Sequence, residues 1–415
     1  MSLLGNVAIV DDYAPTRRLA PYFRDSGYEC VRVQSTLEVP AVFLPSLSLD
    51  GYVANIVHKG SLPQTLCELA GYRPVAVVAG SEIGVELADA LSEGLGLASN
   101  GTALSAARRD KWTMIDTITA AGLPAASQLR VSSAGELRRW HERIGGRIVV
   151  KPTRSSGSKG VYFCDSPEEA AAAYRKLLGD ADIFGQPNES VVAQEYLPGT
   201  EYELNTVSRA GRHHICDIWR PLHADINGVL DKEVGDYIIP REGAIQDRLV
   251  SYGCQVLDAI GIRYGPAHME IKMTPDGPRL VEIAARMSGS DCPYHTELAI
   301  DESQLNWTVD AYVNPARFDH HYPDTYRINH QVAFVGMLSP CAGILRSYPY
   351  LSEVERLESL YELHMVVKPG DPISLSIPGA THPMFAILRH RVEEIVMRDM
   401  QTLRYLDGPA FYDVE

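Results

Sequence analysis

The chain has 415 residues, of which 45% are hydrophobic and 22% are charged, and its formal net charge at pH 7 is −15. This length exceeds what one hydrophobic core usually supports, so we expect two or three domains. The acidic balance and the absence of clustered Lys and Arg argue against nucleic acid as a partner. No apolar run approaches the roughly 20 residues of a membrane span, so we expect no membrane partner.

The beginning of the sequence and its cysteines predict a cytoplasmic location. The stretch "MSLLGNVAIVDD" lacks a basic region and reaches Asp11 and Asp12 almost at once, so we expect no cleaved signal peptide. The seven cysteines form no CxxC pair and lack the His spacing of a zinc site. We therefore expect reduced, mostly buried thiols.

The first hundred residues alternate between strand and helix patterns. The runs "NVAIVDD" and "YECVRVQS" flank a helical stretch, which is typical of a βαβ unit. The pattern returns at "PVAVVAG", followed by a helix that we expect Ser81 to cap, with Glu82 in its first turn. The simplest account is a small parallel sheet with flanking helices. No GxGxxG motif supports a dinucleotide site.

The next segment predicts a compact α+β unit. A helix ends at Gly122, a second helix is capped at Ser132 or Ser133, and a third begins at Pro167. The run "SVVAQEYLPGTEYELNTVS" reads as two strands around a short break.

The remaining sequence predicts more strands than helices. A hairpin includes "RAGRHHICDIWR", a helix covers about 241–260, and a strand pair turns at 275–277. Beyond 330 we expect strands, a turn-rich stretch at 368–380 and a last helix near 390–400.

A lysine and a Gly/Ser loop form the first functional signal. The strand "IVVKP" presents Lys151 and leads into "SSGSKG". Backbone N–H groups of such loops can approach phosphate oxygens, and a nearby lysine supplies the compensating charge. The loop does not match GxxxxGK[ST], and alone it is more often a hairpin or a solvated connection.

Two glutamates form the second signal. Glu270 and Glu282 lie on the strand pair, where both carboxylates can project from one face. Like charges repel unless a cation lies between them, and two carboxylates suit Mg²⁺ or Mn²⁺. Solvated glutamates on an exposed face are the alternative, which the apolar neighbours Ile271, Val281 and Ile283 disfavour.

The order of these parts resembles the ATP-grasp superfamily, clearly from about 75 to 300. The parts are Lys111, Lys151 with its loop, "QEYLPGTE", Glu270, Glu282 and Arg286. The resemblance implies a fold of class α/β and α+β, namely an ATP-grasp fold with an N-terminal Rossmann-like parallel-sheet domain at 1–105. The central ATP-grasp part with its lid would cover 106–197. The C-terminal subdomain with the metal site and an extra β-rich region would cover 198–415.

By resemblance, the lysines contact ATP phosphates and the adenine edge, the loop is a mobile lid, the strand break holds adenine, and one glutamate holds the ribose. The residues implied are Lys111, Lys151, Ser156, Gly157, Ser158, Gly160, Gln194, Glu195, Tyr196, Leu197 and Glu201. A strand break also leaves backbone groups unpaired, which an adenine edge can use. For Glu201, a rim carboxylate in water is the alternative.

The cofactors implied are ATP and two Mg²⁺ or Mn²⁺ ions held by Glu270 and Glu282. Many superfamily members have an asparagine two residues after the second glutamate, where this sequence has Ala284. The second ion would then be bound in another mode or less tightly.

The reaction implied is ATP-dependent, ADP-forming ligation through an acyl phosphate. The stretch "VEIAARMSGSDCPYH" is most similar to the L-amino-acid (dipeptide) ligases, which join one amino acid to the amine of another. Arg286 is the catalytic candidate, because its guanidinium can stabilise an oxyanion at the carbonyl carbon. A structural salt bridge is an equal alternative for Arg286.

The substrates implied are amino acids or similar small molecules, and a homodimer is one possible assembly. Five residues are candidates for substrate contacts: Glu82, His268, Ser288, Gly289 and His295. A hydrogen-bonded filler is the commoner role of a lone His, and a first-turn carboxylate is the alternative for Glu82. Two other functions compete: an ATP-grasp enzyme of nucleotide or cofactor metabolism that uses formate or bicarbonate, and a non-catalytic ATP-binding module. The presence of both carboxylates, both lysines and Arg286 disfavours the module.

Overall fold

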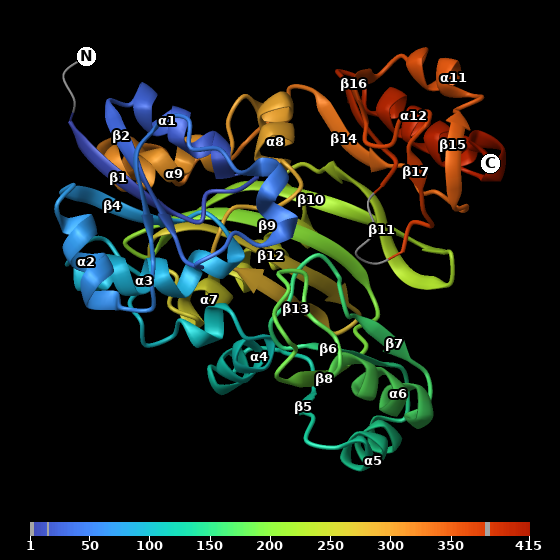
Figure 1. Ribbon diagram of the computed structural model, residues 1–415, viewed down its shortest axis with the longest axis horizontal. Coiled ribbons are helices and arrows are strands. Elements are labelled where there is room, and N and C mark those ends of the chain that lie inside the picture. The colour runs from blue at the N-terminus through green and yellow to red at the C-terminus, as the bar shows by residue number, and fades with distance from the viewer. Residues whose placement is uncertain (1–3, 15, 378–381) are drawn as a thin grey trace.

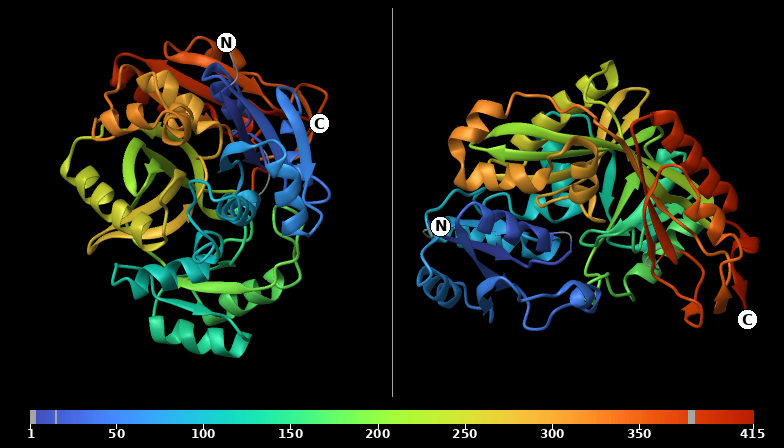
Figure 2. Two further views of the ribbon diagram at one scale, coloured as in Figure 1. Left: turned by 90° about the vertical axis from the view of Figure 1, so that its left-hand side faces the viewer. Right: turned by 90° about the horizontal axis from the view of Figure 1, so that it is seen from above.

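The computed structural model describes residues 4–14, 16–377 and 382–415 of the chain. In this part of the chain one parallel and three antiparallel sheets carry the architecture. Figure 1 shows the N-terminal sheet (blue) and the C-terminal segment around β15 (Gly343–Ser347; orange to red) at opposite ends of the long axis, and Figure 2 shows the same separation from above. No helix in the described ranges is long and apolar enough to cross a membrane.

The N-terminal domain is the parallel sheet that the βαβ pattern predicts. Its strand order is β3-β2-β1-β4. Alternate residues of β1 pack on opposite faces: Ile9 joins the cluster of Phe23, and Val10 joins the cluster of Leu91. Burial on both faces explains the continuous apolar run in this strand. The elements are β1 (Gly5–Val10), α1 (Leu19–Asp25), β2 (Tyr28–Gln34), β3 (Tyr52–Val57), α2 (Leu62–Ala70), β4 (Pro74–Ala79) and α3 (Val85–Gly94).

The predicted start of the helix after β4 is wrong in one respect. The Ser81 side chain caps no helix, and α3 begins only at Val85, after a single 3-10 turn at Glu82–Gly84. Glu82 is buried because its carboxylate turns inward to two arginines rather than lying in an exposed first turn.

A second unit, here called the lid unit, is an antiparallel sheet of order β5-β8-β6-β7 with two helices on one side. The first helix has the predicted cap, since the Ser133 hydroxyl accepts from the Glu136 N–H. The second begins at Pro167 as predicted, and the Ser166 hydroxyl before it accepts from the Glu169 N–H. Helix α4 (Lys111–Ala120) precedes the unit. Its elements are β5 (Gln128–Arg130), α5 (Ala134–Ile144), β6 (Ile148–Pro152), β7 (Tyr162–Cys164), α6 (Pro167–Leu177) and β8 (Val191–Glu195).

The largest sheet has eight antiparallel strands in the order β13-β12-β9-β10-β11-β14-β18-β16. Helix α7 (Ala244–Ala259) packs on it, close to the predicted 241–260, and the main apolar core lies between them. The strands are β9 (Thr200–Arg209), β10 (Arg212–Ile226), β11 (Val229–Ile238), β12 (Gly265–Thr274), β13 (Gly277–Ala284), β14 (Gln331–Gly336), β16 (Leu360–Met365) and β18 (Met384–His390).

The remaining elements complete the C-terminal part. The predicted last helix runs over Glu393–Leu406 (α12), and part of the predicted turn-rich stretch, 378–381, lies outside the described residues. The sequence patterns did not identify the three consecutive helices α8 (Cys292–Ile300), α9 (Gln304–Val313) and α10 (Pro315–His321). The other elements are β15 (Gly343–Ser347), α11 (Leu351–Glu355), β17 (Pro372–Ile373) and β19 (Asp413–Val414).

Candidate active site

A cavity of about 560 Å³ lies between the lid unit and the large sheet. Most of the predicted site residues line it; Gly160, Glu82 and His295 do not. The predicted residues that do are Lys111, Lys151, Ser156, Gly157, Ser158, Gln194, Glu195, Tyr196, Leu197, Glu201, His268, Glu270, Glu282, Arg286, Ser288 and Gly289.

The two predicted lysines reach the cavity from different elements. Lys151 lies in a buried run of β6, and Lys111 is the first residue of α4, where Asp110 caps the helix. The Lys111 ammonium donates to the Ser155 carbonyl at 2.8 Å and to Glu282 at 2.7 Å. Burial, with the charge of Lys111 second, lowers the pKa of Lys151 to about 8. Lys151 is therefore still mostly protonated at neutral pH.

The loop after Lys151 has the open backbone that the sequence predicts. Gly157 and Ser158 both have positive φ, and both line the cavity. Gly160 also has positive φ, but a Cβ atom there would lie 2.9 Å from Leu177 and 3.0 Å from Pro152. Because Gly160 lies outside the cavity and packs this tightly, its predicted role in nucleotide binding is not supported.

The strand break after β8 forms one wall of the cavity. The N–H groups of Glu195 and Tyr196 donate to the carbonyls of Ser127 and Arg147. The prediction that the strand break leaves its backbone groups unpaired is therefore wrong for these two N–H groups. Leu197 is 9% exposed and faces the cavity, which places an apolar surface where a flat ring can pack.

Glu201 is a buried carboxylate rather than a solvated rim residue. Its side chain is only 14% exposed, and the Lys272 ammonium lies 3.5 Å from it and 3.2 Å from Asp231. Burial raises the pKa of Glu201 to about 7, and the charge of Glu270 adds to this effect.

The two predicted metal ligands lie directly opposite each other. Glu270 of β12 pairs in register with Glu282 of β13, so both carboxylates share one face. Enclosure by the cavity raises the pKa of Glu270, but the His268 ring, 3.8 Å away, and the charges of Lys111 and Lys151 outweigh it and hold the pKa at about 2. Two carboxylates side by side are a pair of hard oxygen donors that fits Mg²⁺. Ala284 is buried and offers no further oxygen.

Arg286 lies two residues beyond the end of β13. Its Nε donates to Glu82 at 3.1 Å, and one terminal nitrogen donates to the Met287 carbonyl at 2.8 Å. The second carboxylate oxygen of Glu82 accepts from Arg109. Burial raises the pKa of Glu82, but Arg109, Arg286 and Lys111 outweigh it, so the pKa lies below its ordinary value.

The geometry changes the roles predicted for two substrate residues. Glu82 lies outside the cavity with both oxygens occupied by arginines, so it supports Arg286 instead of meeting an amino group. His295 lies in α8, is 4% exposed and stacks on Phe334, because the helix turns it into the core. His268 does line the cavity, and its Nδ1 lies 2.8 Å from the Asn205 amide oxygen.

Besides Asp231, three further lining carboxylates were not predicted from the sequence: Glu203, Glu233 and Asp236. For Glu203 a signal existed, because it follows Glu201 by two residues in the same strand and therefore faces the same side. For the other two, three residues apart in β11, no regular strand spacing indicates a shared face.

Comparison with known proteins agrees with this geometry. A family model described as an ATP-grasp domain matches residues 144–295. Dapdiamide A synthase of Enterobacter agglomerans is 32% identical over 97% of both chains. An L-arginine-specific L-amino acid ligase of Bacillus subtilis is 24% identical over 67% of this chain and 66% of its own.

Among solved structures, an L-amino acid ligase from Bacillus licheniformis has the same fold, with a TM-score of 0.74 and 18% identity over 98% of both chains. These matches confirm the predicted fold class and amino-acid ligation with ADP formation, and they give less support to the formate- or bicarbonate-using alternative. The chain belongs to the ATP-grasp family, among its ATP-dependent, ADP-forming carboxylate–amine ligases.

Proposed function

We propose that this ligase phosphorylates the carboxylate of one amino acid inside the described cavity and couples it there to the amine of a second amino acid. The observation that carries the proposal is one wall of the cavity. Glu270 and Glu282 lie opposite each other in register, Lys111 contacts Glu282, and Lys151 lies close to both carboxylates. Such a wall suits transfer of the γ-phosphoryl group, in which positioning and charge stabilisation supply most of the catalysis.

ATP would lie along the lid side of the cavity. Leu197 and the Gln194–Tyr196 segment would receive adenine, Glu201 the ribose hydroxyls, and the two lysines with the 155–159 loop the phosphates. Glu270 and Glu282 would hold Mg²⁺, and we propose that two ions bind. When bound, Mg²⁺ would neutralise charge on the phosphate oxygens.

Arg286 would act on the carbonyl oxygen of the acyl phosphate. One terminal nitrogen of its guanidinium takes part in no hydrogen bond within the described ranges, while the other two nitrogens are held by Glu82 and Met287. A guanidinium fixed in this way is a preorganised donor for an oxyanion. Glu82 and Arg109 are positioning residues in this scheme, because they hold Arg286 without lining the cavity.

The relative from Bacillus subtilis supports an amino acid as substrate, since it is described as an L-amino acid ligase. We also propose a cytoplasmic location, in keeping with seven free thiols, and a homodimer as the assembly. Analytical ultracentrifugation of the purified chain tests the assembly.

The decisive experiment is a pairwise panel of the twenty L-amino acids with ATP and Mg²⁺, with and without added bicarbonate or formate. We expect ADP, phosphate and a new amide product, detected by mass spectrometry, in a subset of pairs and independently of bicarbonate or formate. Stoichiometric pyrophosphate, or product only when bicarbonate or formate is present, would overturn the proposal.

A further inference from the structure

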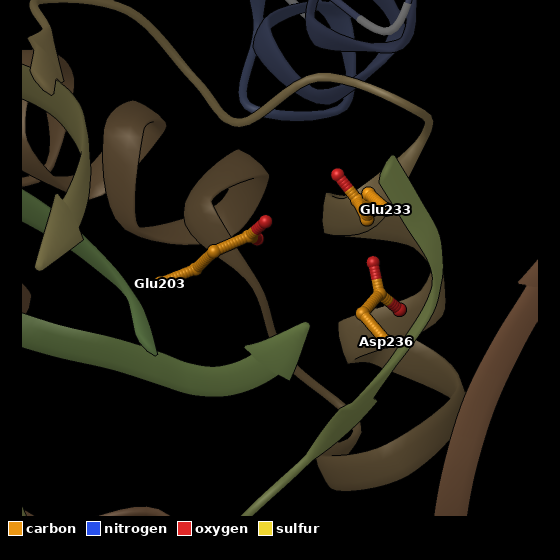
Figure 3. Close-up of side chains that lie close together, drawn as sticks. All are labelled: Glu203, Glu233 and Asp236. Carbon is orange, nitrogen blue, oxygen red and sulfur yellow. The ribbon is translucent and has the colours of Figure 1, made fainter. Parts of the chain in front are cut away.

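Three carboxylates converge at the part of the cavity beyond Glu270. Glu203 points across a gap toward Glu233 and Asp236, as Figure 3 shows. One oxygen from each lies within 4.8 Å of the others. We call this group the acidic tripod.

Strand register explains how the tripod forms. Glu203 of β9 is paired with Glu270 of β12 on one side and with Trp219 of β10 on the other. Asp236 pairs with Pro221 of β10, which follows Trp219 by two residues, so Glu203 and Asp236 share a face.

A β-bulge adds Glu233 to that face. Between Glu233 and Gly235 the register shifts, and Val234 has no partner on β10. Glu233 therefore pairs with His223, which lies on the same face as Pro221. In a regular strand, residues three apart would point to opposite faces.

The tripod lacks the cations that the other cavity carboxylates have. Glu195 has Arg279, Glu201 and Asp231 share Lys272, Glu270 has His268, and Glu282 has Lys111. Within the described ranges no Lys, Arg or His forms an ion pair with a tripod member. In this part of the chain the tripod therefore has three carboxyl groups and no cation of the protein paired with them.

Asp236 gives an independent sign of a ligand. Its side chain is 6% exposed, it points into the tripod, and its Oδ1 has no hydrogen-bond partner in the part of the chain that the structure describes. Burial raises the pKa of Asp236, and the charge of Glu233 raises it further. An unpaired buried acceptor is costly unless a donor fills the site.

The spacing and chemistry suit an ammonium group. An ammonium nitrogen that donates three hydrogen bonds of about 2.9 Å in tetrahedral directions holds its acceptors about 4.7 Å apart. Mg²⁺ at about 2.1 Å holds neighbouring oxygens only about 3 Å apart and commonly keeps several waters. The three tripod oxygens lie within 4.8 Å of one another, so one ammonium nitrogen can reach all three.

The nitrogen in question is one that does not react. Three carboxylates favour the charged form of an amine and so remove its nucleophilicity, which excludes the attacking amine of the acceptor. The tripod is in register with Glu270, next to where the carboxylate would be phosphorylated. The fitting group is therefore the amino group of the carboxylate donor.

We propose that Glu203, Glu233 and Asp236 bind the ammonium group of the amino acid whose carboxylate is activated. This inference rests on the proposed function, which it deepens by naming the class of donor: an amino acid with a free, protonated amino group. The same contact would keep the donor from acting as its own acceptor.

The test measures equilibrium binding to the full-length protein loaded with Mg²⁺ and ADP, by calorimetry. The probes are the twenty L-amino acids, followed by the 2-hydroxy acid that matches the tightest binder. We expect replacement of the ammonium by hydroxyl to weaken binding about 10- to 100-fold in the wild type. Asp236→Asn should weaken the amino acid about 10-fold or more and leave the hydroxy acid unchanged.

Glu233→Gln is the second variant, since its exposed side chain can be changed without disturbing the core. Glu242→Gln is the matched control, because it removes one exposed carboxylate away from the cavity lining. Equal weakening of both probes in Asp236→Asn and Glu233→Gln, or no amino-acid binding by the wild type, would overturn the proposal. So would a fall in the number of bound Mn²⁺ ions, counted by electron paramagnetic resonance, with an unchanged preference for the amino acid.

Failure of the proposed function gives a different result. In that case the wild type would still prefer the amino acid over the hydroxy acid, but no pair in the panel would give an amide.

Discussion

The two ends of the cavity carry carboxylates on the same face of one sheet, but they differ in how these charges are balanced. At the lysine end, Glu282 is already in contact with Lys111, and Glu270 is held ionised by its neighbours. At the tripod end, Asp236 and Glu203 have raised pKa values, through burial first and neighbouring acids second. The lysine end, whose carboxylates already have cationic neighbours, suits a metal with phosphates. The tripod end has no ion-paired cation among the described residues, so its cation must come from a ligand.

The largest expected effect lies at the lysine end. Glu282→Gln should lower turnover by about 10³-fold or more, because Mg²⁺ contributes several kcal/mol to phosphoryl transfer and would lose one of two ionised donors. The measurement is steady-state phosphate release with the best amino-acid pair. The melting temperature should stay within a few degrees of the wild type, and Glu242→Gln should retain full turnover. Near-normal activity of Glu282→Gln in Mg²⁺ would show that the metal is held elsewhere.

Arg286 tests whether amide formation can be impaired without impairing phosphoryl transfer. Arg286→Lys should lower the amide-forming step by about 10²- to 10³-fold, because a lysine cannot keep the planar contacts to Glu82 and the oxyanion together. Single-turnover kinetics, with ADP and amide followed separately, checks this. ADP affinity should be unchanged. If ADP formation and nucleotide affinity fall together with amide formation, Arg286 serves the phosphates or the fold.

A substitution of Lys151 tests how much its positive charge contributes to nucleotide binding. Lys151→Met should weaken ADP binding by about 10- to 100-fold, the effect of losing a charge-assisted hydrogen bond. Wild-type affinity should also decline as pH rises through about 8, where Lys151 loses its proton, and the variant should lack that decline. Calorimetry between pH 7 and 9 measures both, and Lys368→Met, which alters an exposed lysine, is the control. Parallel pH profiles would exclude Lys151 as the titrating group.

The smallest effect concerns stability next to the tripod. Asp217 is 1% exposed and accepts hydrogen bonds from the neutral donors Asn205 and Thr296, and burial raises its pKa to about 7. Since the folded pKa exceeds the unfolded one, its contribution to stability is complete below about pH 4 and is lost as pH rises toward 7.

Asp217→Asn removes this titration. Relative to the wild type, the free energy of unfolding of the variant should rise by about 2–3 kcal/mol between pH 5 and pH 8. Urea denaturation at both pH values measures the difference in unfolding free energy between the variant and the wild type. The contributions of the other carboxylates are the same in both proteins and therefore cancel. An unchanged difference at the two pH values would mean that Asp217 is not the group that titrates.

The sequence predicted features that depend on regular spacing. The placement of Glu270 and Glu282 on one face follows from a strand pair with a short turn, and the cap at Ser133 follows from local hydrogen bonding. The position of Lys151 near the end of a strand follows from the apolar run before it and the Gly/Ser loop after it. These properties are set by residues near in the chain, so one sequence is enough to infer them.

Features that depend on distant partners could not be predicted. Glu82 looks like an exposed first-turn residue until Arg109 and Arg286 are brought to it by the fold. The helices α8 and α9 are buried on several sides and include buried polar residues such as Gln304, so they lack the one-sided apolar pattern of a surface helix. The tripod joins β9 to β11 across an intervening strand, with an irregular register.

The unpartnered Val234 makes chain length, rather than residue identity, a means of changing which donor the enzyme accepts. Insertion of one residue between Leu222 and His223 would give Val234 a partner, restore strict alternation and turn Glu233 to the opposite face. Deletion of Val234 would remove the bulge and leave Glu233 and Asp236 side by side. The insertion would thus remove Glu233 from the tripod face, and the deletion would keep it there. Relatives with a different hairpin length would therefore differ in donor specificity without a substitution in the cavity.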